Sequence, residues 1–275
     1  MPETRFVDVR RFESIDSTNR YLLDEARAGA PEGVVAVADH QTAGRGRLGR
    51  TWEAPAGANL LLSVLLRPLL APEARHLSTT AVALAAVDAI AAVVIDAVGV
   101  GVEVGIKWPN DLVASDGRKL AGVLAEADLA SSGLEGLEGL EGLEGLPDPV
   151  VVGIGINVNW PAIDEDLSPE LRGAAVSLRQ LAGGSVDREA LLEHMLLALE
   201  PRVSALSTPE GRTLLGDDLR RKCTTIGTRV RVDLPDGSFV GTAVAVTDDG
   251  HLTVDVDGVP RTVVAGDVVH VRPGS

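Results

Sequence analysis

The C-terminal part of the chain differs in pattern from everything that precedes it. After Thr225, short segments of alternating polar and apolar residues are separated by three Asp-Gly dipeptides. An Asp-Gly pair between such segments is a strong turn signal, and regularly spaced turns are typical of small antiparallel β structures. The sequence therefore predicts two domains, a larger one over residues 1–223 and a small β-barrel over residues 224–275.

The larger domain contains both strand-like and helix-like segments. Short apolar runs that end at Gly, Pro or polar clusters predict strands, whereas longer capped or Ala-rich stretches predict helices. This mixture predicts an α+β fold in which helices pack on a mixed β-sheet. The predicted strands are 6–12, 34–38, 59–66, 102–108, 111–114, 119–127 and 150–159, and the predicted helices are 17–28, 72–98, 187–206 and 209–222.

Composition limits the kinds of protein that the chain can be. The formal net charge is −15, which disfavours a general nucleic-acid binder because such a protein should carry a basic face. The single cysteine, Cys223, has no second cysteine with which to form an internal disulfide. This fits a protein of a reducing compartment. The most apolar run, 81–102, carries Asp88 and Asp96 and is predicted to be a buried helix. We expect a cytoplasmic protein that is outside the membrane and has no nucleic-acid partner.

Residues 133–147 contain an insertion of unusual composition. A Leu-Glu-Gly triplet occurs four times in succession and is followed by one more leucine. Glycine at every third position weakens both helices and strands. We predict that this repeat is an exposed, flexible hairpin extension without a chemical role.

A basic, glycine-rich segment lies at residues 41–52 of this acidic chain. Three arginines and three glycines fall within seven positions, and Trp52 closes the run. Arginine forks match carboxylate or phosphate oxygens, and glycines let a backbone approach a bound group closely. The Gly-x-Gly-x-x-Gly spacing also fits the dinucleotide template, but Pro55 and Gly57 stand where that template needs a helix. The segment is either an anion-binding loop or a solvated surface loop.

Three further segments carry polar groups at the ends of predicted elements. Ser17-Thr18-Asn19 begins the first helix, where these residues either cap the helix or form part of a polar ligand site. Lys107–Asp111 places a cation, an amide and a carboxylate in a turn that Pro109 stiffens. Lys119 follows on the second strand of a predicted hairpin. The glycines at 153 and 155 indicate that something approaches the last strand closely.

Together these segments resemble the biotin–protein ligases, also called biotin–acetyl-CoA-carboxylase ligases. The resemblance covers most of residues 15–160, and the C-terminal β module is also as the family has it. It implies a catalytic domain like that of class II aminoacyl-tRNA synthetases and an SH3-like C-terminal barrel. In the family's order, the matching segments are Ser17–Asn19, Gln41–Trp52, Gly57–Ser63, Lys107–Asp111, Lys119–Leu124 and Gly153–Asn159.

The resemblance implies an ATP-dependent ligase that uses Mg²⁺ and takes biotin as its substrate. The biotin carboxylate attacks the α-phosphate of ATP, giving biotinyl-5'-AMP and pyrophosphate. A lysine of a biotin carboxyl carrier domain then takes the biotin and releases AMP. Because two anions must meet in the first step, a site rich in cations is the chemistry that this reaction needs.

The family's functional positions carry over onto this sequence residue by residue. Arg47 and Lys119 match the catalytic positions, and Asp111 is a weaker match to a Mg²⁺ organiser. The implied biotin contacts are Ser17, Thr18, Asn19, Gln41, Arg45, Gly46, Arg47 and Lys119, and the implied ATP or adenylate contacts are Arg50, Trp52, Lys107, Asn110 and Asn157.

Two other functions compete with this interpretation. A lipoate–protein ligase would use the same adenylate logic, but its family's Arg-Arg-x-x-Gly-Gly-Gly signature is absent. A non-catalytic biotin- or adenylate-binding regulator would not need both Lys107 and Lys119.

Relatives that repress transcription carry an N-terminal DNA-binding module. About forty residues precede the basic segment, so we expect a monofunctional ligase without a repressor role. We expect a monomer or a weak homodimer.

Overall fold

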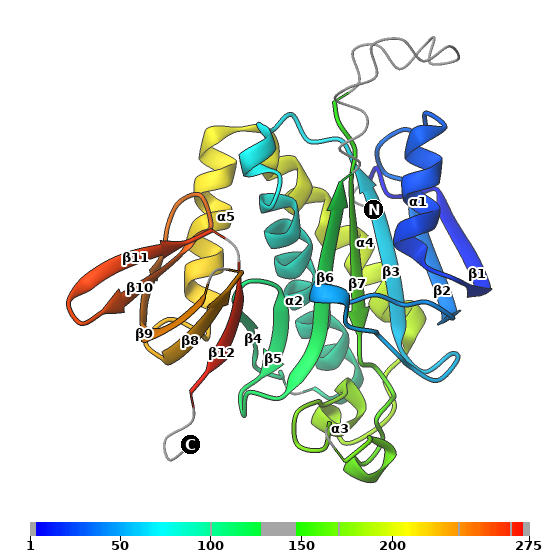
Figure 1. Ribbon diagram of the computed structural model, residues 1–275. Coiled ribbons are helices and arrows are strands. Elements are labelled where there is room, and N and C mark those ends of the chain that lie inside the picture. Colours follow the sequence, from blue (N-terminus) through cyan, green and yellow to red (C-terminus); the bar gives the residue numbers. More distant parts are fainter. Residues whose placement is uncertain are drawn as a thin grey trace.

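The computed structural model describes residues 4–99, 101–127, 147–169, 171–235, 237–264 and 266–271. Seven strands form its larger sheet: β1 (Val9–Ile15), β2 (Val35–Gln41), β3 (Leu60–Leu66), β4 (Val104–Lys107), β5 (Asp111–Ala114), β6 (Lys119–Ala127) and β7 (Val150–Ile156). They lie in the order β1-β2-β3-β7-β6-β5-β4 (Figure 1). Strands β1 and β2 pair in parallel and the other neighbours are antiparallel. The predicted mixed sheet is confirmed.

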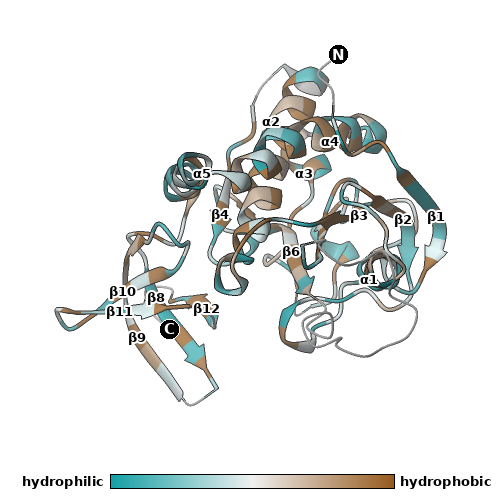
Figure 2. Ribbon diagram, turned by 90° about the horizontal axis from the view of Figure 1, so that it is seen from above, coloured by the Kyte–Doolittle hydropathy of each residue, from teal (hydrophilic) through white to brown (hydrophobic). Residues whose placement is uncertain are grey.

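Helices cover both faces of this sheet. They are α1 (Thr18–Arg27), α2 (Leu77–Val98), α3 (Leu178–Ala182), α4 (Arg188–Ser204) and α5 (Pro209–Lys222). Helix α1 lies on one face, and α2 and α4 lie on the other (Figure 2). Every residue of the central strand β3 is buried, because Leu62 and Val64 pack toward α2 while Leu65 packs toward α1.

Helix α2 is the most apolar of the long helices. The stretch Pro72–Asp96 is long and apolar enough to cross a membrane by length and composition, but 72% of an 18-residue apolar stretch within it is buried. It packs between the sheet and α4, and it ends at Gly99, whose φ of 72° and N–H bond to the Ile95 carbonyl form a left-handed cap. The prediction of a buried helix is confirmed.

The C-terminal strands form a second sheet. They are β8 (Arg229–Leu234), β9 (Gly237–Val246), β10 (Leu252–Val256), β11 (Val259–Val263) and β12 (Asp267–His270). All their pairings are antiparallel, in the order β11-β10-β9-β8-β12. Asp257 and Gly258 have φ of 53° and 84°, as the mirror-image turns of tight hairpins require. The predicted antiparallel C-terminal β structure is confirmed.

Trp108 joins the two sheets. Its indole N–H donates to the Gly250 carbonyl at 2.9 Å, and its backbone N–H donates to Thr225 Oγ1 at 3.0 Å. Next to it, Ile106 forms an isolated parallel bridge with Cys223, which is buried and whose thiol pKa is raised by that burial. The turn that follows β4 is therefore anchored to the second sheet.

Two elements in particular differ from the sequence predictions, and one prediction is not tested. The first strand was predicted too early, because Phe6 is buried in the core without belonging to the ladder that starts at Val9. Helix α3 was not predicted at all, since five residues give no helical period. Of the repeat predicted over 133–147, only Pro147 lies among the described residues, so its hairpin form stays a prediction.

Candidate active site

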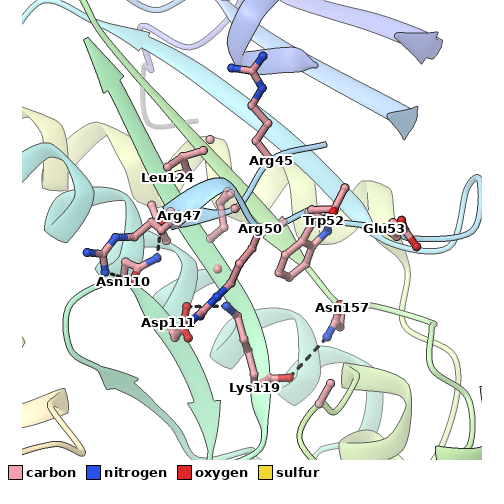
Figure 3. Close-up of a pocket in the computed structure, with 18 of the residues that line it drawn as sticks. Arg45, Arg47, Arg50, Trp52, Glu53, Asn110, Asp111, Lys119, Leu124 and Asn157 are labelled. Carbon is pink, nitrogen blue, oxygen red and sulfur yellow. Dashed lines mark hydrogen bonds and ion pairs between the residues drawn. The ribbon is translucent and has the colours of Figure 1, made fainter. Parts of the chain in front are cut away.

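One cavity of about 760 Å³ lies between the larger sheet, the basic segment and the C-terminal sheet. Figure 3 shows side chains that reach this cavity from the basic segment and from the larger sheet and its turns. Every residue for which the sequence implied a role lines this cavity: Ser17, Thr18, Asn19, Gln41, Arg45, Gly46, Arg47, Arg50, Trp52, Lys107, Asn110, Asp111, Lys119 and Asn157. Segments far apart in the chain are thus brought to one place.

A row of buried polar side chains runs along the cavity wall. The Thr18 N–H and hydroxyl lie 2.8 Å and 3.1 Å from Gln41 Oε1, and the same hydroxyl lies 2.7 Å from Ser63 Oγ. Ser63 Oγ donates to Asn19 Oδ1 at 2.6 Å. Ser17 caps α1 by accepting from the Arg20 N–H, and it also lines the cavity. The polar contribution of Ser63 was missed; its signal was a lone hydroxyl inside an apolar strand.

Paired glycines form a floor beneath Trp52. Gly122 on β6 and Gly155 on β7 are direct partners in the sheet. A Cβ added at Gly155 would lie 2.5 Å from Trp52 Cε2, and one at Gly122 would lie 3.3 Å from Cζ3. Gly153 likewise leaves room for the Asn19 side chain, because an added Cβ would lie only 2.2 Å from Asn19 Oδ1. The predicted close approach to this strand is made by side chains of the protein itself.

Lys119 is held between a carboxylate and an aromatic ring. Its Nζ lies 2.7 Å from Asp111 Oδ1 on the neighbouring strand β5. The same Nζ lies 5.6 Å from the centroid of the Trp52 ring, within the range of a cation–π interaction. These two contacts fix the ammonium group at the cavity, where it can meet an anion.

The basic segment folds back on itself in a tight turn. The Gly46 N–H donates to the Arg50 carbonyl at 2.6 Å, and the Trp52 N–H donates to the Gly44 carbonyl at 3.0 Å. Leu48 and Gly49 have φ of 57° and 72°, in the left-handed region that favours glycine. The segment is therefore an internally hydrogen-bonded turn beside the cavity, and most of its residues are exposed to solvent.

The arginines of this turn point in different directions. Arg47 donates to Asn110 Oδ1 at 2.9 Å and to the Gly266 carbonyl at 3.0 Å. Burial lowers the pKa of Arg47 from its ordinary value, although the charges of Asp267 and Asp111 act in the opposite direction. Arg45 points away from Arg47 and Asn110 (Figure 3). The turn thus holds a half-buried Arg47 over the cavity, while the exposed side chain of Arg45 extends in another direction.

The C-terminal sheet contributes a wall that sequence reasoning missed. Asp267, Val268 and Val269 of β12 line the cavity, and Arg50 donates to Asp267 Oδ2 at 2.5 Å. The loop that contains Leu167 and Leu171 was also missed as a lining segment. Neither stretch carries a sequence motif. Both reach the cavity only because distant parts of the chain pack together there.

The side-chain amides of Asn110 and Asn157 donate to backbone carbonyls. Asn110 Nδ2 donates to the Val123 carbonyl at 2.7 Å, and Asn157 Nδ2 donates to the Val176 carbonyl at 3.1 Å. Both amides therefore order the cavity wall. Lys107, in contrast, lines the cavity without an ion pair to any residue within the described ranges.

The carboxylates allow a limited form of metal binding. Within the described part of the chain, no three His, Cys, Asp or Glu side chains are grouped to hold a metal ion. Mg²⁺ that is bound with nucleotide phosphates needs only about one or two protein carboxylates. Asp111 has one oxygen that is not held by Lys119 and so fits that kind of site.

Family profiles match both parts of the chain. The profile described as "Biotin/lipoate A/B protein ligase family" matches residues 11–138, and "Biotin protein ligase C terminal domain" matches residues 225–271. The fold and the two matching profiles are thus those of a cofactor–protein ligase. The biotin–[acetyl-CoA-carboxylase] ligase of Mycobacterium tuberculosis is 40% identical over 259 residues, which span 93% of this chain and 86% of that protein. The chain belongs to the biotin protein ligase family.

Other relatives agree with this assignment. The bifunctional ligase/repressor BirA of Bacillus subtilis is 32% identical over 92% of this chain and 71% of its own length. The fold is also that of the biotin protein ligase from Aquifex aeolicus solved with biotin and ATP. That structure has a TM-score of 0.75 and 23% identity and covers 98% of this chain and 100% of its own.

Proposed function

We propose that this protein activates biotin with ATP as biotinyl-5'-AMP and transfers it to a lysine of a biotin carboxyl carrier domain. The observation that carries the proposal is the gathering of all the implied ligase residues in one cavity. The 40% identity to a biotin–[acetyl-CoA-carboxylase] ligase over most of both chains supports the same reaction. The acceptor is accordingly the carrier domain of an acetyl-CoA carboxylase.

The cavity offers a different chemistry to each part of the substrates. The polar row of Thr18, Gln41, Ser63 and Asn19 suits the ureido head of biotin, which carries two N–H donors and one carbonyl. Ser17 at the start of α1 belongs to the same wall. The apolar ring and chain of biotin need burial, which Leu62, Val123 and Leu124 supply.

The cations bring together the two anions of the first step. The biotin carboxylate attacks the α-phosphate and pyrophosphate leaves, so negative charge accumulates between the two substrates. Lys119 stabilises the reacting carboxylate and phosphate, and Lys107 has no ion pair to give up among the residues that the structure describes. A charge-assisted hydrogen bond of this kind contributes about 1.5–3 kcal/mol. When it is bound, Mg²⁺ neutralises phosphate charge, with Asp111 as its protein ligand.

The basic turn then retains the adenylate. Arg45, Gly46 and Arg47 close over biotin and its activated carboxyl, while Arg50, Trp52, Asn110 and Asn157 form the nucleotide side of the cavity. Water must be excluded at this stage, because a mixed anhydride is readily hydrolysed. In the second step, the uncharged lysine amine of the carrier attacks the biotinyl carbonyl, AMP leaves, and the nitrogen gives up a proton.

Intact mass spectrometry of the carrier domain tests this function. Incubation with ATP, Mg²⁺ and biotin should add one biotinyl group to the carrier, and omission of ATP should prevent the addition. A parallel reaction with lipoate and a lipoyl domain separates the related ligase activity. Transfer of lipoate and not biotin would overturn the proposal.

With its single cysteine buried and unpaired, the enzyme suits the cytoplasm, where carboxylases are made.

A further inference from the structure

Glu126 stands at the end of the polar row, outside the residues assigned a role so far. It lies on β6, and 27% of its side chain is exposed. Its Oε2 accepts from Asn19 Nδ2 at 2.7 Å, while Oε1 lies 3.8 Å from Arg45 Nη1. One carboxylate therefore contacts both the polar row and the basic turn.

Glu126 determines which way the Asn19 amide points. In the structure, Asn19 Nδ2 donates to Glu126 Oε2 and to the Leu124 carbonyl, the latter at 3.2 Å, and Oδ1 accepts from Ser63. If the amide were turned over, its oxygen would face a carboxylate and a carbonyl, which are both acceptors. That arrangement is repulsive, so Asn19 must offer an oxygen to Ser63.

The direction of the whole row follows from a count of hydrogens. Three oxygen–oxygen contacts, Asn19–Ser63 at 2.6 Å, Ser63–Thr18 at 2.7 Å and Thr18–Gln41 at 3.1 Å, share only two hydroxyl hydrogens. The Ser63 hydrogen goes to Asn19, since an amide oxygen cannot donate. The Thr18 hydrogen goes to Ser63, because that contact is the shorter one. Gln41 Oε1 then keeps a lone pair beside its bond from the Thr18 N–H.

We propose that Glu126 is a positioning residue, which orients this row so that Thr18 and Gln41 face the ligand as acceptors. The role rests on the proposed function, because the ureido head of biotin brings two N–H donors. Without the carboxylate, only the 3.2 Å bond to the Leu124 carbonyl still opposes a turned-over Asn19 amide, so the row can reverse. Asn19 would then donate to Ser63, Ser63 to Thr18, and Thr18 to Gln41, which would occupy the Gln41 lone pair before biotin arrives. Glu126 thus selects a ligand that donates hydrogen bonds.

The test compares Glu126→Ala with the conservative variant Glu126→Gln. In Glu126→Ala, the biotin KM should rise about tenfold, as expected for one hydrogen bond to a charged group. The ATP KM and kcat should stay within about twofold, because ground-state binding of biotin alone is weakened. Glu126→Gln should restore the biotin KM, since its amide oxygen can still accept from Asn19. The matched control is Glu189→Ala, which removes an exposed carboxylate paired with Arg11.

A biotin analogue methylated at one ureido nitrogen lacks one N–H donor. Its binding relative to biotin therefore measures whether the polar row accepts hydrogen bonds from the ligand. The wild-type enzyme should discriminate against it, and Glu126→Ala should do so less strongly. An unchanged biotin KM in Glu126→Ala would overturn the role. So would a Glu126→Gln variant as defective as Glu126→Ala, because the Arg45 ion pair would then be the cause.

A third variant covers the case in which Glu126→Ala does not fold. Ser63→Ala interrupts the same row, and unchanged biotin binding and discrimination there would also refute the role of Glu126. A wild-type enzyme that neither binds nor transfers biotin would overturn both the role and the proposed function. Normal wild-type turnover with an unaffected Glu126→Ala would overturn the role alone.

Discussion

Arg50 of the basic turn and Asp267 of β12 form an ion pair at 2.5 Å across 217 positions of sequence. The Arg50 side chain is 67% exposed, so this pair should contribute less than about 1 kcal/mol to folding. Asp267→Asn should therefore leave the free energy of unfolding nearly unchanged while freeing one end of the turn. Limited trypsin digestion should cut the variant faster at the arginines of the turn. Asp233→Asn, which breaks an ion pair with Arg231 in the same sheet, is the control and should be cut like the wild type.

Arg47→Gly should loosen the retention of the adenylate. The variant loses the bonds to Asn110 and to the Gly266 carbonyl, and glycine adds backbone freedom to the turn. Free biotinyl-5'-AMP should leave the enzyme before transfer, so that lysines on unrelated proteins become labelled. Mass mapping of labelled lysines and a filter assay of adenylate release would measure this. Asn110→Ala should shift both readouts in the same direction by less, whereas an unchanged adenylate lifetime would contradict the role of Arg47.

Lys119→Ala should nearly abolish adenylate formation. The loss removes the cation at the reacting groups and leaves Asp111 as an unpaired negative charge there. By analogy with other preorganised donors, the rate should fall about 100- to 1000-fold. Pyrophosphate release with saturating biotin and ATP measures the first step directly. Lys222→Ala, at the end of α5 and outside the cavity, should release pyrophosphate at the wild-type rate.

Gly155→Ala should displace Trp52 from its floor. The new methyl group would lie 2.5 Å from Cε2 and 2.7 Å from Nε1, so the indole must move. Such overpacking costs about 1–3 kcal/mol, and the displaced ring also leaves Lys119 without its aromatic neighbour. Near-UV circular dichroism and chemical unfolding would detect both effects. Gly184→Ala should be silent, because nothing lies within 4 Å of its added Cβ.

His270 should make the fold less stable at mildly acidic pH. Burial, and after it the charge of Lys107, lowers the pKa of His270 below its ordinary value. The unfolded chain therefore binds this proton at a higher pH than the folded chain does. The contribution is complete above about pH 6.5 and is lost as the pH falls through the folded-state pKa. His270→Gln should flatten the fall in the free energy of unfolding between about pH 7 and pH 5.5. Equal losses in both proteins would contradict this.

Sequence patterns gave most of the larger sheet because its strands are apolar and sharply bounded. The hairpin of β5 and β6 was found from Asp116-Gly117, whose glycine has the left-handed φ of 84° that the turn needs. The start of β1 was misplaced, because an edge strand with Arg10, Arg11 and Glu13 carries charges where apolar alternation was sought. Buried Phe6 gave a false signal, since burial does not require strand pairing.

The candidate site was also predicted only in part. Lys119 and the arginines were singled out because they lie in short sequence motifs that can be read locally. The contacts that hold them were not found, since Asp267 and Glu126 reach the site only through tertiary packing. Asn157 shows the limit from the other direction: it lines the cavity as expected, but its amide is bonded to the Val176 carbonyl.

The double anchoring of Trp108 has a consequence for protein engineering. Its ring and backbone are bound to Gly250 between β9 and β10 and to Thr225 before β8, while the adjacent Lys107 and Asn110 line the cavity. A chimera that received this sheet from another ligase would have to supply a hydroxyl where Thr225 stands and a carbonyl where Gly250 stands. A sheet grafted without them would shift the Lys107–Asp111 turn, although the graft itself contained no altered catalytic residue. The two sheets are therefore one unit of exchange.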